Sequence, residues 1–264
     1  MDRLIIWLGL LMIVMTAYVA FVSGPPVGEA LKQMVVPQLV DWTTITTIVG
    51  GTVGGYITYA GAHRLLDRGT VGPENLGAVT AGAVNGIAVT GVMRFLLFLA
   101  ILGVVSSGVV IDVSGKGANP AAQAFQAAAG EFGLRVFGLV LWAAAITSVI
   151  GAAYTSMSFL SAFKGDISER ARNRATVVFI AVSLAVFLLM GTAPAALLVF
   201  AGGFNGLILP LGMTIFMIIG WRRTDLLGGV PYPKWLLVLG TAVCVLTWYM
   251  GVVSVGPIFR LLAA

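Results

Sequence analysis

The sequence has few of the residues on which soluble enzymes and disulfide-bonded domains depend. Only 9% of its 264 residues are charged, whereas about a quarter are charged in an average soluble domain. The single cysteine, Cys244, excludes an internal disulfide framework and a cysteine metal site. No phosphate-binding loop, nucleophile triad or carboxylate pair stands out among the remaining polar residues, so we expect neither an enzyme nor a cofactor.

Apolar residues are abundant instead and occur in long runs. Hydrophobic residues make up 59% of the chain, in runs close to the ~20 residues that a helix needs to cross a bilayer. Strands of an outer-membrane barrel would show shorter, alternating segments. The sequence therefore predicts an all-α polytopic membrane protein, with a single transmembrane domain over residues 1–264 and about seven helices. The predicted spans are 4–23, 39–62, 86–111, 134–163, 175–193, 195–220 and 234–259.

The basic residues indicate how these spans are oriented. With seven spans, 11 of the 15 lysines and arginines fall on one side. The positive-inside rule then predicts a multi-pass protein of the inner (plasma) membrane, with a cytoplasmic N-terminus and an external C-terminus. The net charge of +5 thus reflects membrane orientation, and membrane lipid rather than nucleic acid is the expected partner.

The second predicted span contains a segment that disfavours a continuous helix. The segment GGTVGGYITYAGAHR, residues 50–64, carries five glycines, and each costs about 1 kcal/mol relative to alanine inside a helix. A broken helix is tolerated in lipid only where protein or a water-filled cavity satisfies its freed backbone groups, as in secondary transporters that bind substrate near the midplane. Alternatively, Gly51 and Gly55 form a close-packing face. Threonines and tyrosines along the span favour a lined cavity, so we predict a break around Thr52–Tyr56.

The residues around this break are the predicted substrate-binding residues: Thr52, Gly54, Gly55, Tyr56, Thr58 and Tyr59. Asn205 lies in another glycine-rich span and is too polar for a lipid-facing position, so it is predicted to point inward. His63 follows the break and titrates near neutral pH, which is typical of a proton relay. The alternative is that His63, next to Arg64, marks the cytoplasmic end of the helix.

Arg94 interrupts an otherwise apolar stretch. If its helix begins near residue 86, the guanidinium lies two turns inside the membrane, where ionisable groups are costly and usually functional. Alternatively, Arg94 reaches outward to the cytoplasmic headgroups. If Arg94 is functional, we expect it to bind the solute. A guanidinium repels metal cations and pairs with carboxylates, so Arg94 favours a small organic anion over a metal ion.

Four segments together resemble one transporter family. GGTVGGYI resembles the broken sixth helix of the NRAMP family of divalent-metal transporters, whose usual pattern there is G-A-T-V-M-P-H-N. Three later segments resemble the seventh, eighth and tenth helices of the same family: VNGIAVTGVMRFLLFLAI, LWAAAITSVIGAAYTSMSFLSAF and AGGFNGLILPLG. The resemblance implies the second half of a LeuT-type inverted-repeat fold, from about the fifth helix onward.

Two departures from the family pattern change what the resemblance implies. The metal-binding methionine and the histidine of the pattern fall on Gly54 and Tyr56, so the thioether that selects soft metals is absent. The first helices of the family have no counterpart here, which implies a companion membrane chain that supplies them, or else a truncated gene.

The expected function follows from this resemblance. It is a subunit or half of an NRAMP-like secondary transporter that moves a small solute, either a divalent metal ion or a small organic anion, by alternating access coupled to ions or protons. The alternative is a non-transporting membrane scaffold or regulatory subunit of a larger complex.

Overall fold

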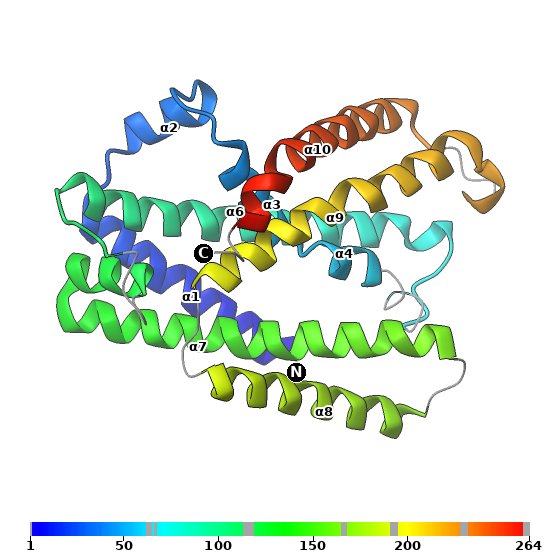
Figure 1. The fold of residues 1–264 in the computed structure, drawn as a ribbon, viewed down its shortest axis with the longest axis horizontal. Coiled ribbons are helices and arrows are strands. Elements are labelled where there is room, and N and C mark those ends of the chain that lie inside the picture. The colour runs from blue at the N-terminus through cyan, green and yellow to red at the C-terminus, as the bar shows by residue number, and fades with distance from the viewer. Residues whose placement is uncertain are drawn as a thin grey trace. The chain divides into compact units, whose positions relative to one another are not determined.

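The fold is built from helices (Figure 1). A computed structural model describes residues 2–61, 65, 68–112, 119–164, 168–190, 195–227 and 232–260. Its α-helices are α1 (Asp2–Ser23), α2 (Val27–Val35), α3 (Trp42–Val53), α4 (Tyr56–Ala60), α6 (Leu76–Ser106), α7 (Pro120–Lys164), α8 (Glu169–Met190), α9 (Ala195–Arg222) and α10 (Lys234–Arg260). Two short 3₁₀ helices, η1 (Pro73–Asn75) and η2 (Thr224–Leu227), precede α6 and follow α9. No β-strand occurs within these described ranges.

The described helices confirm an all-α polytopic membrane protein. Six of them are long and apolar enough to cross a membrane, and each covers most of one of the seven predicted spans. The span predicted at 86–111 ends early, because α6 stops at Ser106. The second predicted span, 39–62, is the exception because it is divided between α3 and α4. At 1.5 Å per residue, the 12 residues of α3 extend only about 18 Å, well short of ~30 Å of hydrocarbon.

Two helices begin earlier than the sequence predicted. The span expected at 86–111 is α6, which starts at Leu76; its first turns contain neither proline nor charge, so nothing stops the helix despite the many glycines. The span expected at 134–163 is α7, which starts at Pro120. Pro120 suits a first helical position because its missing N–H would have no partner there. The side chain of Asn119 accepts the amide N–H of Ala122 at 3.1 Å and caps this end.

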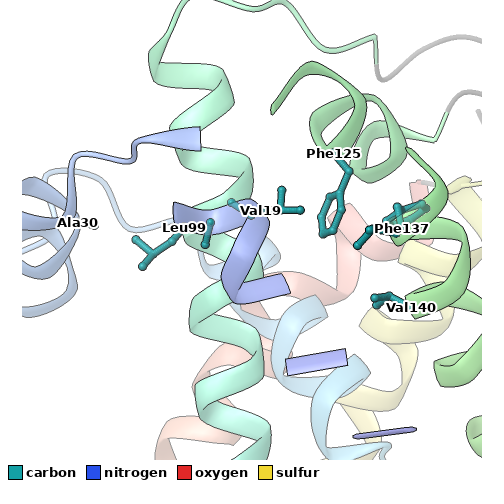
Figure 2. Packing of buried hydrophobic residues seen from close by; sticks show 9 residues of the cluster. Val19, Ala30, Leu99, Phe125, Phe137 and Val140 are labelled. Carbon is teal, nitrogen blue, oxygen red and sulfur yellow. The ribbon is translucent and has the colours of Figure 1, made fainter. Parts of the chain in front are cut away.

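The chain divides into two compact units. The first contains residues 1–39 and 74–153, and the second contains residues 40–73 and 154–264. The core of the first unit gathers buried side chains from α1, α2, α6 and α7, including Val19 and Leu99 (Figure 2). Phe125 and Phe137 belong to the same cluster, with ring centroids 5.2 Å apart. They come from the two sides of a kink in α7 at Gly130, whose φ is +61°.

The second unit is centred on α9, against which α3 and α10 pack. Figure 1 shows α9 (yellow to orange) and α10 (orange to red) side by side. A Cβ atom added to Gly50 would lie 2.0 Å from the carbonyl oxygen of Gly202 and 2.2 Å from the amide nitrogen of Gly206. The backbones of α3 and α9 are therefore in direct contact. On the α10 side, the buried hydroxyls of Thr46 and Ser254 lie 2.9 Å apart.

Candidate functional site

The break between α3 and α4 occurs at two glycines with left-handed φ angles. Gly54 has φ +75° and ψ 18°, and its N–H donates to the carbonyl of Gly50 at 2.9 Å, which closes the last turn of α3. Gly55 then takes φ +49° and ψ −112°, a backbone conformation that residues other than glycine rarely adopt. The predicted discontinuity around Thr52–Tyr56 is confirmed.

The break frees backbone groups, and a nearby hydroxyl satisfies one of them. Among the described residues, no main-chain hydrogen bond from residues 55 and 56 returns to α3. The hydroxyl of Thr58 donates to the carbonyl of Val53, and the hydroxyl of Thr52 donates to the carbonyl of Ile48. These two threonines therefore bond to the backbone of their own segment. At the other end of α3, the carboxylate of Asp41 accepts the N–H groups of Thr43 and Thr44 and caps the helix.

Asn205 of α9 lies directly against the break, and its side chain points inward as predicted. A Cβ atom added to Gly55 would lie 2.7 Å from the amide oxygen of Asn205 and 2.9 Å from its Cα atom. Gly55 is buried and Asn205 is half-buried. The absence of a side chain at Gly55 is thus what allows the Asn205 amide to approach the freed backbone.

Two tyrosines of α4 connect the break to neighbouring helices of the second unit. The hydroxyl of Tyr56 lies 2.8 Å from the hydroxyl of Ser156 on α7, in an arrangement where either group can donate. The hydroxyl of Tyr59 donates to the carbonyl oxygen of Leu209 on α9 at 2.6 Å. Ser156 was not among the predicted site residues, although it lies in a hydroxyl-rich run of the sequence at 154–158 that could have indicated a polar contact.

The break has one closed face and one exposed face within the second unit. Gly55 faces α9 and is buried, whereas Thr52, Val53 and Thr58 are exposed. The side chain of Tyr56 is 42% exposed even though its hydroxyl is bonded. The freed backbone, the Asn205 amide and the Tyr56 hydroxyl are uncharged donors and acceptors, which suit a desolvated ion or a small polar solute. The exposed face leaves room for such a solute or for further helices.

The structure does not place the other two predicted site residues, Arg94 and His63, relative to this break. Arg94 lies in the first unit, on α6, and its side chain is exposed. Its role in solute binding stays a prediction. His63, the predicted proton relay, lies outside the described residues. Within the described ranges, no group of three or more histidine, cysteine, aspartate or glutamate side chains is placed to hold a metal ion.

Comparison with known proteins identifies relatives along almost the whole chain. The family model described as natural resistance-associated macrophage protein-like, Nramp, matches residues 1–256. An uncharacterized membrane protein of Bacillus subtilis (strain 168), YcsG, is 46% identical over 252 residues, which are 96% of this chain and 61% of that protein. An uncharacterized membrane protein of Haemophilus influenzae is 46% identical over 246 residues, 93% of this chain and 60% of that protein. No solved structure gives a significant match. The chain thus spans about three fifths of the length of these curated relatives.

Proposed function

Because this chain belongs to the Nramp family, we propose that it forms part of an NRAMP-like secondary transporter. The transporter moves a small solute, either a divalent metal ion or a small organic anion, by alternating access with ion or proton coupling. In this proposal the solute is held at the broken helix, and the protein is a carrier and not an enzyme.

The observation that carries this proposal is the two-glycine break with Asn205 against it. Discontinuous helices in membrane transporters expose main-chain groups to substrate near the bilayer midplane. Irregular backbone at membrane depth is tolerated where it lines a cavity or is buried in protein. Here the break is closed by Gly55 and Asn205 on one face and exposed at Thr52 and Thr58 on the other, which is the arrangement of one wall of a binding site.

The exposed face supports a second part of the proposal, a companion membrane segment. The chain spans about three fifths of its curated relatives, and a LeuT-type carrier binds substrate between two repeats. We propose that the remaining helices, from a separate chain or from a longer form of this protein, cover the exposed face of α3 and α4. In the proposed topology the N-terminus of this chain is cytoplasmic and its C-terminus is external.

A non-transporting scaffold or regulatory subunit is the second candidate function. The direct backbone contact of α3 with α9 at Gly50, Gly202 and Gly206 favours it, because glycines in membrane helices also serve close packing alone. In that case the break at Gly54 would shape a packing surface and would bind no solute.

Uptake by the co-expressed assembly tests the proposal. The chain is expressed with the companion helices in vesicles, and entry of manganese, magnesium and small carboxylates is measured for the native sequence and for Arg94→Gln. A carrier accumulates at least one of these solutes, and a scaffold accumulates none. Metal uptake that survives Arg94→Gln excludes Arg94 as the solute-binding group and defeats the organic-anion version. Loss of carboxylate uptake alone supports that version.

A further inference from the structure

A groove between α9 and α10 lies in the second unit and involves none of the residues at the break. Its volume is about 590 Å³, within the roughly 300–1,000 Å³ typical of ligand sites. The lining includes Met217 and Trp221 from α9, with Cys244, Val245 and Trp248 from α10. Both helices are candidate membrane spans, so the groove faces a hydrocarbon environment or another helix.

The polar atoms in this groove are already bonded to one another. The indole N–H of Trp248 donates to the hydroxyl of Thr214 at 2.9 Å, and that hydroxyl donates to the carbonyl of Pro210 at 2.7 Å. The indole N–H of Trp221 donates in the same way to the hydroxyl of Thr241 at 3.0 Å. Because both threonine hydroxyls and both indoles are occupied, the groove offers hydrocarbon and sulfur surface along its length. It suits an alkyl chain better than a polar solute.

A positively charged side chain lies at one end of the groove. Arg222, the last residue of α9, lines the groove and is exposed. The next residue, Arg223, donates to the carboxylate of Asp225 at 2.8 Å, and so its charge is neutralised locally. Lys234, an exposed residue, begins α10. Arg222 sits where the membrane-spanning part of α9 ends, which is the level of the lipid headgroups.

The geometry points to a binding site for an anionic phospholipid, with one acyl chain in the α9–α10 groove and the headgroup phosphate on Arg222. The alkyl chain alone gives no preference between lipids, because every lipid tail is already in hydrocarbon. The preference comes from the headgroup, since each basic residue near an anionic membrane surface strengthens association by about fivefold. The site therefore distinguishes lipids by charge while the groove fixes where the lipid lies.

Lipid binding to the purified chain tests this inference without any transport measurement. Native mass spectrometry counts the phosphatidylglycerol or phosphatidylcholine molecules retained by the detergent-solubilised protein, and thermal unfolding is followed with each lipid. We expect a retained phosphatidylglycerol that phosphatidylcholine does not replace, and an unfolding temperature that rises with phosphatidylglycerol. Equal retention of both lipids, or an equal response to glycerol phosphate lacking acyl chains, would overturn the inference.

Two matched pairs of variants locate the site. Arg222→Gln should weaken phosphatidylglycerol retention by about fivefold, whereas the double variant Arg223→Gln/Asp225→Asn, which removes both members of a neutral ion pair, should leave it nearly unchanged. Val245→Trp should fill the groove and reduce retention, whereas Leu246→Trp, on the same helix outside the groove lining, should not. If the double variant weakens retention as much as Arg222→Gln, the charge of Arg222 is not what holds the lipid and the site is wrong.

Discussion

The hydroxyl oxygen of Tyr56 lies 2.8 Å from the hydroxyl oxygen of Ser156, and this contact joins the short helix after the break to α7. Both residues belong to the second unit. Ser156 is 8% exposed and Tyr56 is 42% exposed, so the bond lies at the boundary between the packed interior of this unit and its exposed face. A solute at the break would meet this hydroxyl pair next to the freed backbone.

Tyr56→Phe should reduce solute uptake while leaving the protein folded. Hydrogen bonds between membrane helices contribute on average about 0.6 kcal/mol, too little for their loss to unfold the chain. If the Tyr56 hydroxyl positions α4 for transport, uptake should fall by up to about fivefold, the equivalent of ~1 kcal/mol. Uptake in vesicles, normalised to folded protein, is the measurement.

Tyr249→Phe is the control for that change. Tyr249 lies in the same unit, where its ring packs edge-on against Trp42 with centroids 5.2 Å apart. Its hydroxyl can be removed without touching the break, so uptake should stay at the native level. Equal uptake by native protein, Tyr56→Phe and Ser156→Ala would show that the hydroxyl pair has no part in transport.

The main-chain conformation at Gly54 gives a second prediction. Its φ of +75° and ψ of 18° place it in the left-handed region, which asparagine tolerates and β-branched residues do not. A Cβ atom at this position would meet only the Cβ of Ile57, at 3.7 Å, so space is not limiting. Gly54→Asn should therefore assemble and retain uptake, whereas Gly54→Val should lose about 1–2 kcal/mol of folding free energy and most uptake.

Thermal unfolding and uptake of the two Gly54 variants, measured side by side, check this prediction. Native uptake by a folded Gly54→Val protein would mean that the left-handed turn is dispensable for transport. That result would favour the scaffold function over the carrier.

The break could be predicted from the sequence because its cause is local. Glycines at 50, 51, 54 and 55 remove the side chains that oppose positive φ, and this preference needs no knowledge of neighbouring helices. The cap at Asp41 is local in the same sense, because its carboxylate bonds to amides two and three residues later. The break and the cap can both be predicted without any tertiary contact.

The partners of the break could not be predicted in this way. Ser156 and Tyr56 are 100 residues apart, and the sequence gives the hydroxyl-rich run on α7 without showing which hydroxyl faces α4. The start of α6 at Leu76 was missed for another reason. Its first two turns contain Gly77, Thr80 and Gly82, which lower the helix propensity. They contain no proline or charge to end the helix.

The contact between α3 and α9 gives a third prediction, for a pair of adjacent glycines. Gly50→Ala should destabilise the chain by about 3 kcal/mol or more, because the added methyl group would lie 2.0 Å from the carbonyl oxygen of Gly202 and backbone atoms cannot move aside cheaply. At Gly51 the same methyl group would meet only the Cα of Gly202, at 4.0 Å. Gly51→Ala should be neutral or stabilising by up to about 1 kcal/mol.

Unfolding temperature in detergent and resistance to proteolysis measure the difference between the two alanine variants. Equal unfolding temperatures would show that α3 and α9 do not approach as closely as described.

The pair Arg223 and Asp225 after α9 gives a prediction of pH dependence. Hydrogen bonds from the Arg223 guanidinium hold the pKa of the Asp225 carboxyl below its ordinary value. A carboxyl whose pKa is lower in the folded state stabilises the fold at pH values above its unfolded pKa, and this contribution is lost as the pH falls through the folded pKa. The Asp225 carboxyl should therefore titrate at lower pH than an isolated aspartate. In Arg223→Gln its pKa, followed by carbon NMR, should rise, and an unchanged pKa would contradict the pairing.

Asn205 provides the sharpest test of what the break binds. A Cβ atom added to Gly55 would lie 2.7 Å from the Asn205 amide oxygen, so this oxygen is close to the freed backbone. A change of charge here acts on that backbone with almost no change of shape. Asn205→Asp adds a carboxylate, a ligand that Mg²⁺ and Mn²⁺ prefer. It should strengthen divalent-metal uptake if the solute is a cation and reduce uptake if the solute is a carboxylate, because like charges repel across a few ångströms in a desolvated site. Asn205→Leu, which keeps the number and branching of the side-chain heavy atoms and removes the amide, serves as the control and should weaken uptake of either solute. Should Asn205→Asp and Asn205→Leu both transport every tested solute as well as the native protein, Asn205 is a packing residue and solute does not bind at the break.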